Sequence, residues 1–159
     1  MARQIELALK LKGVRAIATL LEDEAPRTCS AVWHALPIEG ETYHAKWAGR
    51  ELYTLAPKFP VGPGEENATI TPIPGDVLYF DVSPDTIDLP VALRRQHPKG
   101  LVDLAVFYGR NNLLLGPAGF MPGNLFATIT EGLTDYARAC NELFREGMAN
   151  ERFIIRRIA

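Results

Sequence analysis

The side chains best suited to chemistry in this chain lie in two short segments that mix aromatic, cationic and amide groups. One segment follows a strongly apolar run and reads Tyr108-Gly109-Arg110-Asn111-Asn112. An arginine guanidinium suits bidentate recognition of a carboxylate or phosphate, and loops at strand ends often carry binding sites. We therefore take Tyr108, Arg110 and Asn111 as candidate ligand-binding residues. The alternative is a plain polar turn in which Gly109 and Asn111 adopt unusual backbone angles.

The second segment places His44, Trp47, Arg50 and Tyr53 within ten residues. On a regular strand His44 and Arg50 would share one face, and Trp47 and Tyr53 the other. A bulge at Gly49 would change that arrangement. The functional interpretation is an aromatic and cationic wall that holds a carboxylate or a flat ring, with Trp47 and Arg50 as its candidates. The alternative is a core tryptophan beside a solvated histidine and arginine.

A third candidate pair, Phe120-Met121, lies in a stretch rich in glycine and proline over residues 116–123. It would be either a pocket wall or a lid that packs on the body of the protein.

Motifs for metal, cofactor or covalent chemistry are missing from the sequence. Glu22-Asp23-Glu24 suits a solvated helix start better than a metal site, because negative charge is favourable there. His34, His44 and His97 are far apart in the sequence, and Cys29 and Cys140 form no Cys-x-x-Cys pair. The chain also lacks a Gly-x-Ser-x-Gly elbow and a His-Glu-x-x-His helix. We therefore predict no metal and no cofactor, and we leave the catalytic residues unassigned.

Length and composition favour one soluble domain over residues 1–159. The chain has 159 residues, of which 47% are apolar and 23% charged, as in ordinary globular proteins. A net charge of -2 gives no reason to expect nucleic acid as a partner. No apolar run is long enough to span a bilayer, and the N-terminus lacks the apolar centre of a signal peptide. With both cysteines on apolar helix faces, we expect a reducing, cytoplasmic location.

The apolar patterns predict mainly strands, with two helices that could position the candidates. Pro26 and the apolar spacing from Cys29 to Leu36 predict one helix, which Pro37 ends. Leu133 to Phe144 predict a second helix that ends near Gly147. About eight strands are predicted, over residues 4–11, 14–21, 41–55, 68–73, 77–82, 102–108, 125–130 and 153–158. This set predicts a closed, eight-stranded β-barrel with two capping helices.

Three stretches carry a resemblance to a known family. The helix opening Ala25-Pro26-Arg27-Thr28 lies within residues 20–36, a buried strand ends over 105–109, and Glu131-Gly132 opens the second helix within 126–144. In order and spacing these elements resemble the cyclophilin barrel. The chain looks closer to small bacterial and archaeal cyclophilin-like proteins of unassigned function than to the proline isomerases. The resemblance implies that the loop over 116–123 borders the family's ligand groove.

The resemblance fails at the residues that proline isomerases of this fold use. Those enzymes read Phe-His-Arg and then Phe-Met-x-Gln-Gly-Gly, where the arginine weakens the resonance of the proline amide. Here Tyr43-His44-Ala45 puts an alanine at the arginine position, and Arg50-Glu51 replace Phe-Met. An offset alignment would let Arg50 stand in for the arginine, but no Gln-Gly-Gly follows. We therefore do not expect efficient proline isomerisation, and whether the chain is an enzyme stays open.

Three functional hypotheses follow. In the first, the protein binds a small anionic metabolite or a peptide-like ligand at the barrel mouth, through Trp47, Arg50, Tyr108, Arg110, Asn111, Phe120 and Met121. In the second, it is a proline isomerase, or a hydrolase or lyase acting on a small amide, which rests on fold analogy. In the third, it has a structural role, and the Pro-rich segment 83–100 forms a homo-oligomer contact.

Overall fold

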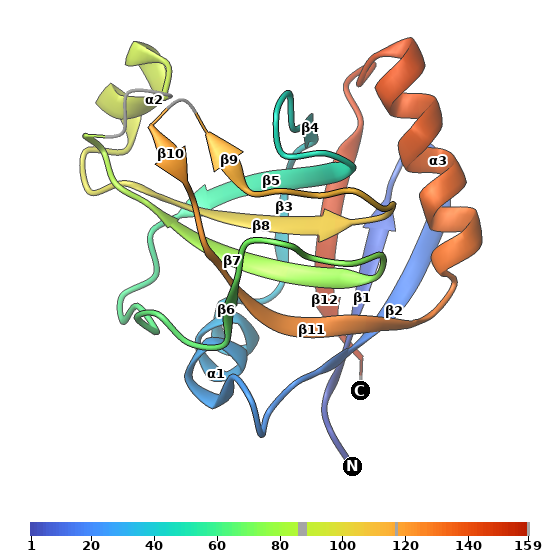
Figure 1. Cartoon of the computed structure of the whole chain (residues 1–159), viewed down its shortest axis with the longest axis horizontal. Helices are drawn as coiled ribbons and strands as arrows, with labels where there is room; N and C mark the ends of the chain where they lie inside the picture. Colours follow the sequence, from blue (N-terminus) through green and yellow to red (C-terminus); the bar gives the residue numbers. More distant parts are fainter. Residues whose placement is uncertain (86–88, 117, 159) are drawn as a thin grey trace.

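The fold is a mainly β structure, seen in a computed structural model that describes residues 1–85, 89–116 and 118–158 (Figure 1). The strands are β1 (Gln4–Leu9), β2 (Val14–Leu20), β3 (Ile38–Glu41), β4 (Tyr43–His44), β5 (Glu51–Pro57), β6 (Ala68–Thr69), β7 (Asp76–Val82), β8 (Leu101–Phe107), β9 (Leu115–Gly116), β10 (Gly119–Phe120), β11 (Gly123–Glu131) and β12 (Arg152–Arg157). The helices are α1 (Pro26–Ala35), α2 (Val91–Gln96) and α3 (Leu133–Glu146).

Nine of the strands form one antiparallel path in the order β3-β12-β1-β2-β11-β7-β8-β5-β4, with the short β6 added beside β11. The path curls into a nearly closed barrel, but β3 and β5 are not paired as neighbouring strands. A side chain bridges the gap instead, since the Thr54 hydroxyl donates to the Glu41 carbonyl at 2.8 Å. Gly40 of β3 lies so close to β5 that a Cβ there would overlap Thr54 Oγ1. The barrel therefore closes through one tight contact rather than through a continuous ladder.

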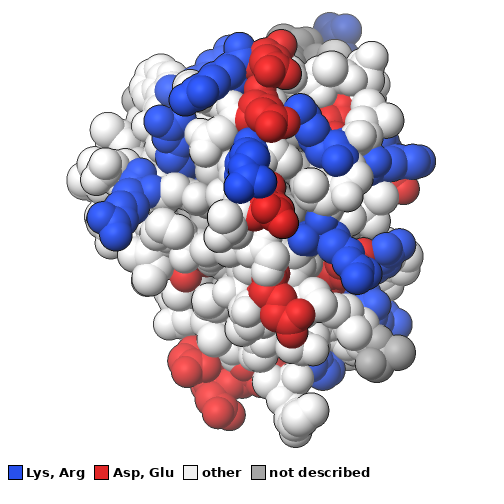
Figure 2. Space-filling view, turned by 90° about the vertical axis from the view of Figure 1, so that its right-hand side faces the viewer, with Lys and Arg blue, Asp and Glu red and all other residues white. Residues whose placement is uncertain are grey.

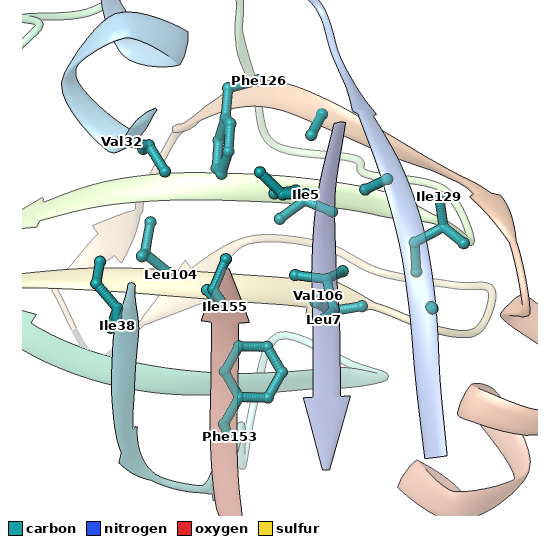
Figure 3. Packing of buried hydrophobic residues seen from close by; sticks show 14 of the residues in the cluster. Ile5, Leu7, Val32, Ile38, Leu104, Val106, Phe126, Ile129, Phe153 and Ile155 are labelled. Carbon is teal, nitrogen blue, oxygen red and sulfur yellow. The ribbon is translucent and has the colours of Figure 1, made fainter. Parts of the chain in front are cut away.

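Alternating residues of the strands fill the barrel, as the sequence pattern predicts. Ile5 and Leu7 of β1 face Leu104 and Val106 of β8 across an interior that also holds Phe126, Ile155 and Phe153 (Figure 3). A second apolar cluster lies on the outer face of β7 and β8, where Leu78, Phe80, Ala105 and Phe107 pack against Leu114. The segment after β8 thus covers the outside of the sheet, so this sheet is buried on both faces.

The two longer helices lie on different parts of the barrel, α1 beside β11 and α3 beside β2 (Figure 1). Pro26 opens α1, and the carboxylate of Glu66 accepts from the N–H groups of Arg27 and Thr28 at 3.2 and 2.8 Å. A distant loop thereby caps the helix N-terminus, which otherwise leaves N–H groups unpaired. Both helices, and the stop at Pro37, agree with the sequence prediction.

Several predicted elements were wrong. The path has nine strands rather than eight, and a third helix, α2, forms within the 83–100 segment, of which residues 86–88 lie outside the described part. The single strand expected over 41–55 divides into β4 and β5, because residues 46–50 bend with Gly49 at a positive φ of 120°. The strand expected over 68–73 ends at Thr69, since Pro72 and Pro74 cannot donate to a ladder. The paired residues of the hairpin β9–β10, which was not predicted, lie partly in the glycine- and proline-rich stretch over 116–123.

The tight contact at Gly40 gives a first testable prediction. A Gly40→Ala change should lower the free energy of unfolding by about 1–3 kcal/mol, because overpacking forces the two strands apart. Urea denaturation would measure the loss. In a Thr54→Ala background the same change should cost less, since the overlapping Oγ1 is gone. Gly62→Ala is the control, because the nearest atom to its added Cβ is 3.9 Å away. Equal costs of Gly40→Ala in both backgrounds would contradict the closure contact.

Candidate functional site

One end of the barrel brings together polar and aromatic side chains from four elements. His44 lies on β4 and Phe144 on α3. Arg50 directly precedes β5, and Tyr108 directly follows β8. The pairing of β5 with β8 fixes this arrangement, because the Tyr108 N–H donates to the Arg50 carbonyl at 3.0 Å. The stem of Arg50 packs on Gly109, where a Cβ would lie 2.7 Å from Arg50 Cγ. We call His44, Arg50, Tyr108 and Phe144 the mouth cluster.

The hydrogen bonds of His44 fix its protonation. Its Nδ1 lies 2.7 Å from the Ala45 carbonyl, which can only accept, so Nδ1 carries the hydrogen. Nε2 of the neutral ring then accepts from the Tyr108 hydroxyl at 2.6 Å. Burial lowers the pKa of His44, and the positive charge of Arg50 lowers it further. His44 is therefore neutral at pH 7 and keeps the Tyr108 hydroxyl hydrogen directed toward itself.

Arg50 is the one charged member of the mouth cluster. Its guanidinium carbon lies 5.2 Å from the centre of the Phe144 ring, a cation–π geometry. Acidic and basic side chains are interspersed on the face that includes α3 (Figure 2), where Lys12 pairs with Glu142 at 2.7 Å. Arg50 differs, because no carboxylate of the described residues lies within 4 Å of it. Its side chain is exposed and its charge is uncompensated.

This arrangement suits binding better than proton transfer. Burial raises the pKa of Tyr108 to about 12, although the neighbouring guanidinium of Arg50 acts in the opposite direction. The hydroxyl thus stays protonated, and its hydrogen is already committed to His44. An anion would instead find the guanidinium of Arg50, which offers several donors in a rigid fork. The cluster can hold a carboxylate or phosphate group without any change in its own hydrogen bonds.

The structure brings some of the predicted site residues together and separates others. Arg50 and Tyr108 meet in the mouth cluster, and the Asn112 side chain accepts from the Arg50 N–H at 2.9 Å, which ties the 108–112 turn to them. Arg110 and Asn111 are exposed on this turn, and Asn111 has the positive φ of 66° that a plain turn requires. His44 is half-buried and bonded at both nitrogens, so the expectation of a solvated ring was wrong.

Trp47, Phe120 and Met121 do not enter the mouth cluster. Trp47 is 61% exposed in the bend between β4 and β5, so it is not a core tryptophan. Phe120 pairs with Leu115 in the β9–β10 hairpin and is 62% exposed, which excludes a lid packed through this ring. The hairpin lies nearer α2 than α3 (Figure 1). These three residues are therefore exposed apolar surface outside the mouth cluster.

Sequence reasoning missed the buried acids on the outer face of β5 and β8. Glu51 is 6% exposed, and one carboxylate oxygen of Asp103 is buried with no hydrogen-bond partner among the described residues. Burial raises the pKa of Glu51 to about 7 and raises that of Asp103 strongly, and the charge of Glu51 adds to the latter effect. The signal was in the sequence, since Asp103 is the one charged residue of Leu101–Phe107. Phe144 was also missed, because it looked like an ordinary core position of its helix.

The described residues contain neither a cluster of metal-ligating side chains nor a helix that could span a membrane. Across residues 1–85, 89–116 and 118–158, no three His, Cys, Asp or Glu side chains are grouped to hold a metal ion. None of the helices described is long and apolar enough to cross a membrane.

The fold and the mouth cluster define a nearly closed antiparallel β-barrel protein with a free cation at one end. Its sequence matches, over residues 7–155, the family described as "Protein of unknown function (DUF3830)". The chain belongs to that family. No curated protein matches it significantly.

Solved structures of other proteins share the fold, among them McbB and AF2241. The structure of McbB in complex with tryptophan has a TM-score of 0.61 at 19% identity, covering 96% of this chain and 44% of McbB. The solution structure of the hypothetical protein AF2241 from Archaeoglobus fulgidus has a TM-score of 0.54 at 18% identity, covering 99% of this chain and 95% of AF2241. This chain thus spans less than half of McbB and nearly all of AF2241. At these identities the likeness concerns the barrel alone.

The His44–Tyr108 bond predicts a measurable contribution to stability. Tyr108→Phe should lower the free energy of unfolding by about 1–2 kcal/mol, because it leaves the half-buried Nε2 without its donor. Chemical denaturation would measure the change. Tyr43→Phe is the matched control, since its hydroxyl bonds Glu41 at the exposed surface and should cost less than about 0.5 kcal/mol. If both variants lose the same amount, the bond does not hold the mouth together.

Glu51 predicts a pH dependence of stability. Its folded pKa of about 7 exceeds the ordinary value of 4.5, so the folded state favours the protonated acid. This preference of the folded state for protonated Glu51 stabilises the protein fully below pH 4.5, and the stabilisation is lost as the pH rises through about 7. Glu51→Gln should therefore raise the melting temperature at pH 8 and lose that advantage at pH 5.

Glu142→Gln provides the opposite control. Its hydrogen bond with Lys12 lowers the pKa of Glu142, so its removal should destabilise the protein at pH 8, if it acts at all. A Glu51→Gln variant that is less stable than the wild type at pH 8 would contradict the buried, unpaired acid.

Proposed function

We propose that this protein binds a small anionic molecule at the barrel mouth, with Arg50 as the anchoring cation. The observation that carries the proposal is the uncompensated guanidinium of Arg50, held over Phe144 beside the His44–Tyr108 pair. An arginine without a carboxylate partner, on a rigid support, is preorganised for an anion and loses little freedom on binding.

The surroundings of Arg50 support a small ligand. Arg110 lies on the turn that Asn112 fastens to the Arg50 N–H, so it adds a second exposed cation to this end of the barrel. The ring of Phe144 and the neutral His44 would border the ligand, and Tyr108 would keep His44 in place. McbB, whose barrel is similar over 44% of that chain, was solved in complex with tryptophan, a small molecule that carries a carboxylate. We place the ligand in the class of small carboxylates and phosphates.

The resemblance to cyclophilins belongs to the same proposal. We propose that the barrel is of the cyclophilin-like type, supported by the opening of α1 at Pro26 and of α3 after Gly132. Within that proposal Ala45 occupies the arginine position of the isomerases, and Arg50 has an anion-binding role instead. The ligand is then held without turnover, because neither His44 nor Tyr108 has a free proton-transfer position.

Isothermal titration calorimetry with inorganic phosphate and with malonate would test the anion site. Arg50→Ala should weaken binding of the preferred anion about tenfold or more, as expected for a hydrogen-bonded charge contact worth about 1.5–3 kcal/mol. Arg50→Lys should recover part of the affinity, since a lysine keeps the charge but loses the fork.

Arg95→Ala is the matched control for charge, because Arg95 is an exposed arginine on α2, away from the mouth. It should leave the affinity within about twofold of the wild type. An equal loss in Arg50→Ala and Arg95→Ala, or no anion binding by the wild type, would overturn the proposal.

A further inference from the structure

A hollow lies away from the mouth cluster, between α1 and the segment over residues 59–63. It is a groove of about 650 Å³, within the size range of small-molecule sites. Its walls are mostly apolar, with Ala31 and Ala35 on the helix side and Phe59 and Val61 on the other. A smaller hollow of about 300 Å³ adjoins it and shares Ala35 and Phe59 as lining residues.

The smaller hollow is the open end of the gap between β3 and β5. It is lined by Ile38 and Glu39 on one side and by residues 55–57 on the other. The two strands are not paired as neighbours, and the Thr54–Glu41 bond joins them only at the far end. The gap therefore opens in the direction of α1, where the apolar groove begins.

Main-chain groups of β3 face this gap. The Thr42 N–H donates to the main-chain carbonyl of Glu151. Because hydrogen-bonded pairs alternate along an antiparallel ladder, residues 40 and 38 also direct their N–H and C=O groups to β12. The groups of Glu39 and Glu41 then point the other way, as the bond from Thr54 to the Glu41 carbonyl shows. Glu39 consequently presents an N–H donor and a C=O acceptor side by side at the wall of the hollow.

The charged side chains at the rim are already neutralised. The Arg27 side chain donates to the Pro63 and Glu65 carbonyls and pairs with Glu66. The Glu39 carboxylate pairs with Arg152 at 3.3 Å and Lys10 at 3.8 Å. The Nδ1 atom of His34 donates to the Ser30 carbonyl at 2.8 Å. Among the described residues, the groove thus offers mostly apolar surface, and its arginine and glutamate side chains are already paired.

We propose that this groove binds a small, neutral molecule that joins an apolar ring to an amide group. The ring lies between α1 and Phe59, and the amide pairs with the N–H and C=O of Glu39. A carboxamide carries one acceptor and an adjacent donor, which matches the two main-chain groups. The proposal is independent of the anion site, because it uses none of the residues of the mouth cluster.

Benzamide is the probe, titrated into the ¹⁵N-labelled full chain and followed by NMR. Saturable shifts are expected at the amides of Ala31, Ala35, Glu39 and Gly62. Methyl benzoate, which lacks the donor, should bind about two- to tenfold more weakly, as one lost hydrogen bond predicts. Benzoate should also bind more weakly, because the Arg27 guanidinium at the rim is already bonded to Glu66 and to two carbonyls. Scattered shifts without saturation, or tighter binding of benzoate than of benzamide, would overturn the proposal.

Two valines provide the matched variants. Val61 lines the groove and is 79% exposed, whereas Val91 on α2 is 53% exposed and lies outside it. Val61→Asp should weaken benzamide binding at least fivefold, and Val91→Asp should leave it unchanged. Both positions are on the surface, so both variants should fold, which the NMR spectrum itself reports. An equal effect of the two changes would remove the groove as the binding site. Phosphate, the probe for the anion site, should not displace benzamide from the groove. The two proposals can therefore fail independently of each other.

Discussion

The closure of the barrel between β3 and β5 is the constraint on which the rest of the structure depends. Gly40 brings the two strands together, and the Thr54 hydroxyl takes the place of a main-chain ladder by donating to the Glu41 carbonyl. After this contact the chain leaves β12 and pairs with β5 as strand β4, which carries His44 to the mouth. On the other side of this contact β3 forms no ladder with β5, and the gap between the two strands opens toward α1. A single closure contact thus sets the geometry of both candidate sites.

Strand β5 connects the two sites, because its side chains alternate between the barrel interior and the outer face of the sheet. Leu52 and Thr54 point into the barrel, while Glu51 and Tyr53 lie on the outer face. Arg50 precedes the strand and extends over Gly109 to Phe144. The uncompensated charge of Arg50 and the buried acid Glu51 are therefore adjacent in the chain, on different faces. A buried polar group without a partner costs stability, so an acid with a raised pKa such as Glu51 is a candidate functional residue.

Much of the fold follows from patterns that are local in the sequence. The alternation of Ile5, Leu7 and Leu9 and the apolar spacing from Leu133 to Phe144 predict where β1 and α3 begin, although β1 ends at Leu9 rather than Leu11. The division of 41–55 into β4 and β5 was not predictable in that way, because it depends on the bend at Gly49 and on the change of partner strand. The site shows the same limit. Arg50 and Tyr108 were recognisable by type, but the acceptor of the Tyr108 hydroxyl is His44, which lies 64 residues earlier and is brought near by strand pairing.

The ring nitrogens of His44, observed by ¹⁵N NMR during a phosphate titration at pH 7, test the central claim most directly. The free protein should show a neutral ring with hydrogen on Nδ1, because the Ala45 carbonyl and the Tyr108 hydroxyl fix that form. Saturating anion beside Arg50 should shift Nε2 without changing the form of the ring. A ring that titrates near pH 6.5 like a free histidine, or an Nε2 signal that ignores the anion, would contradict the account of the barrel mouth.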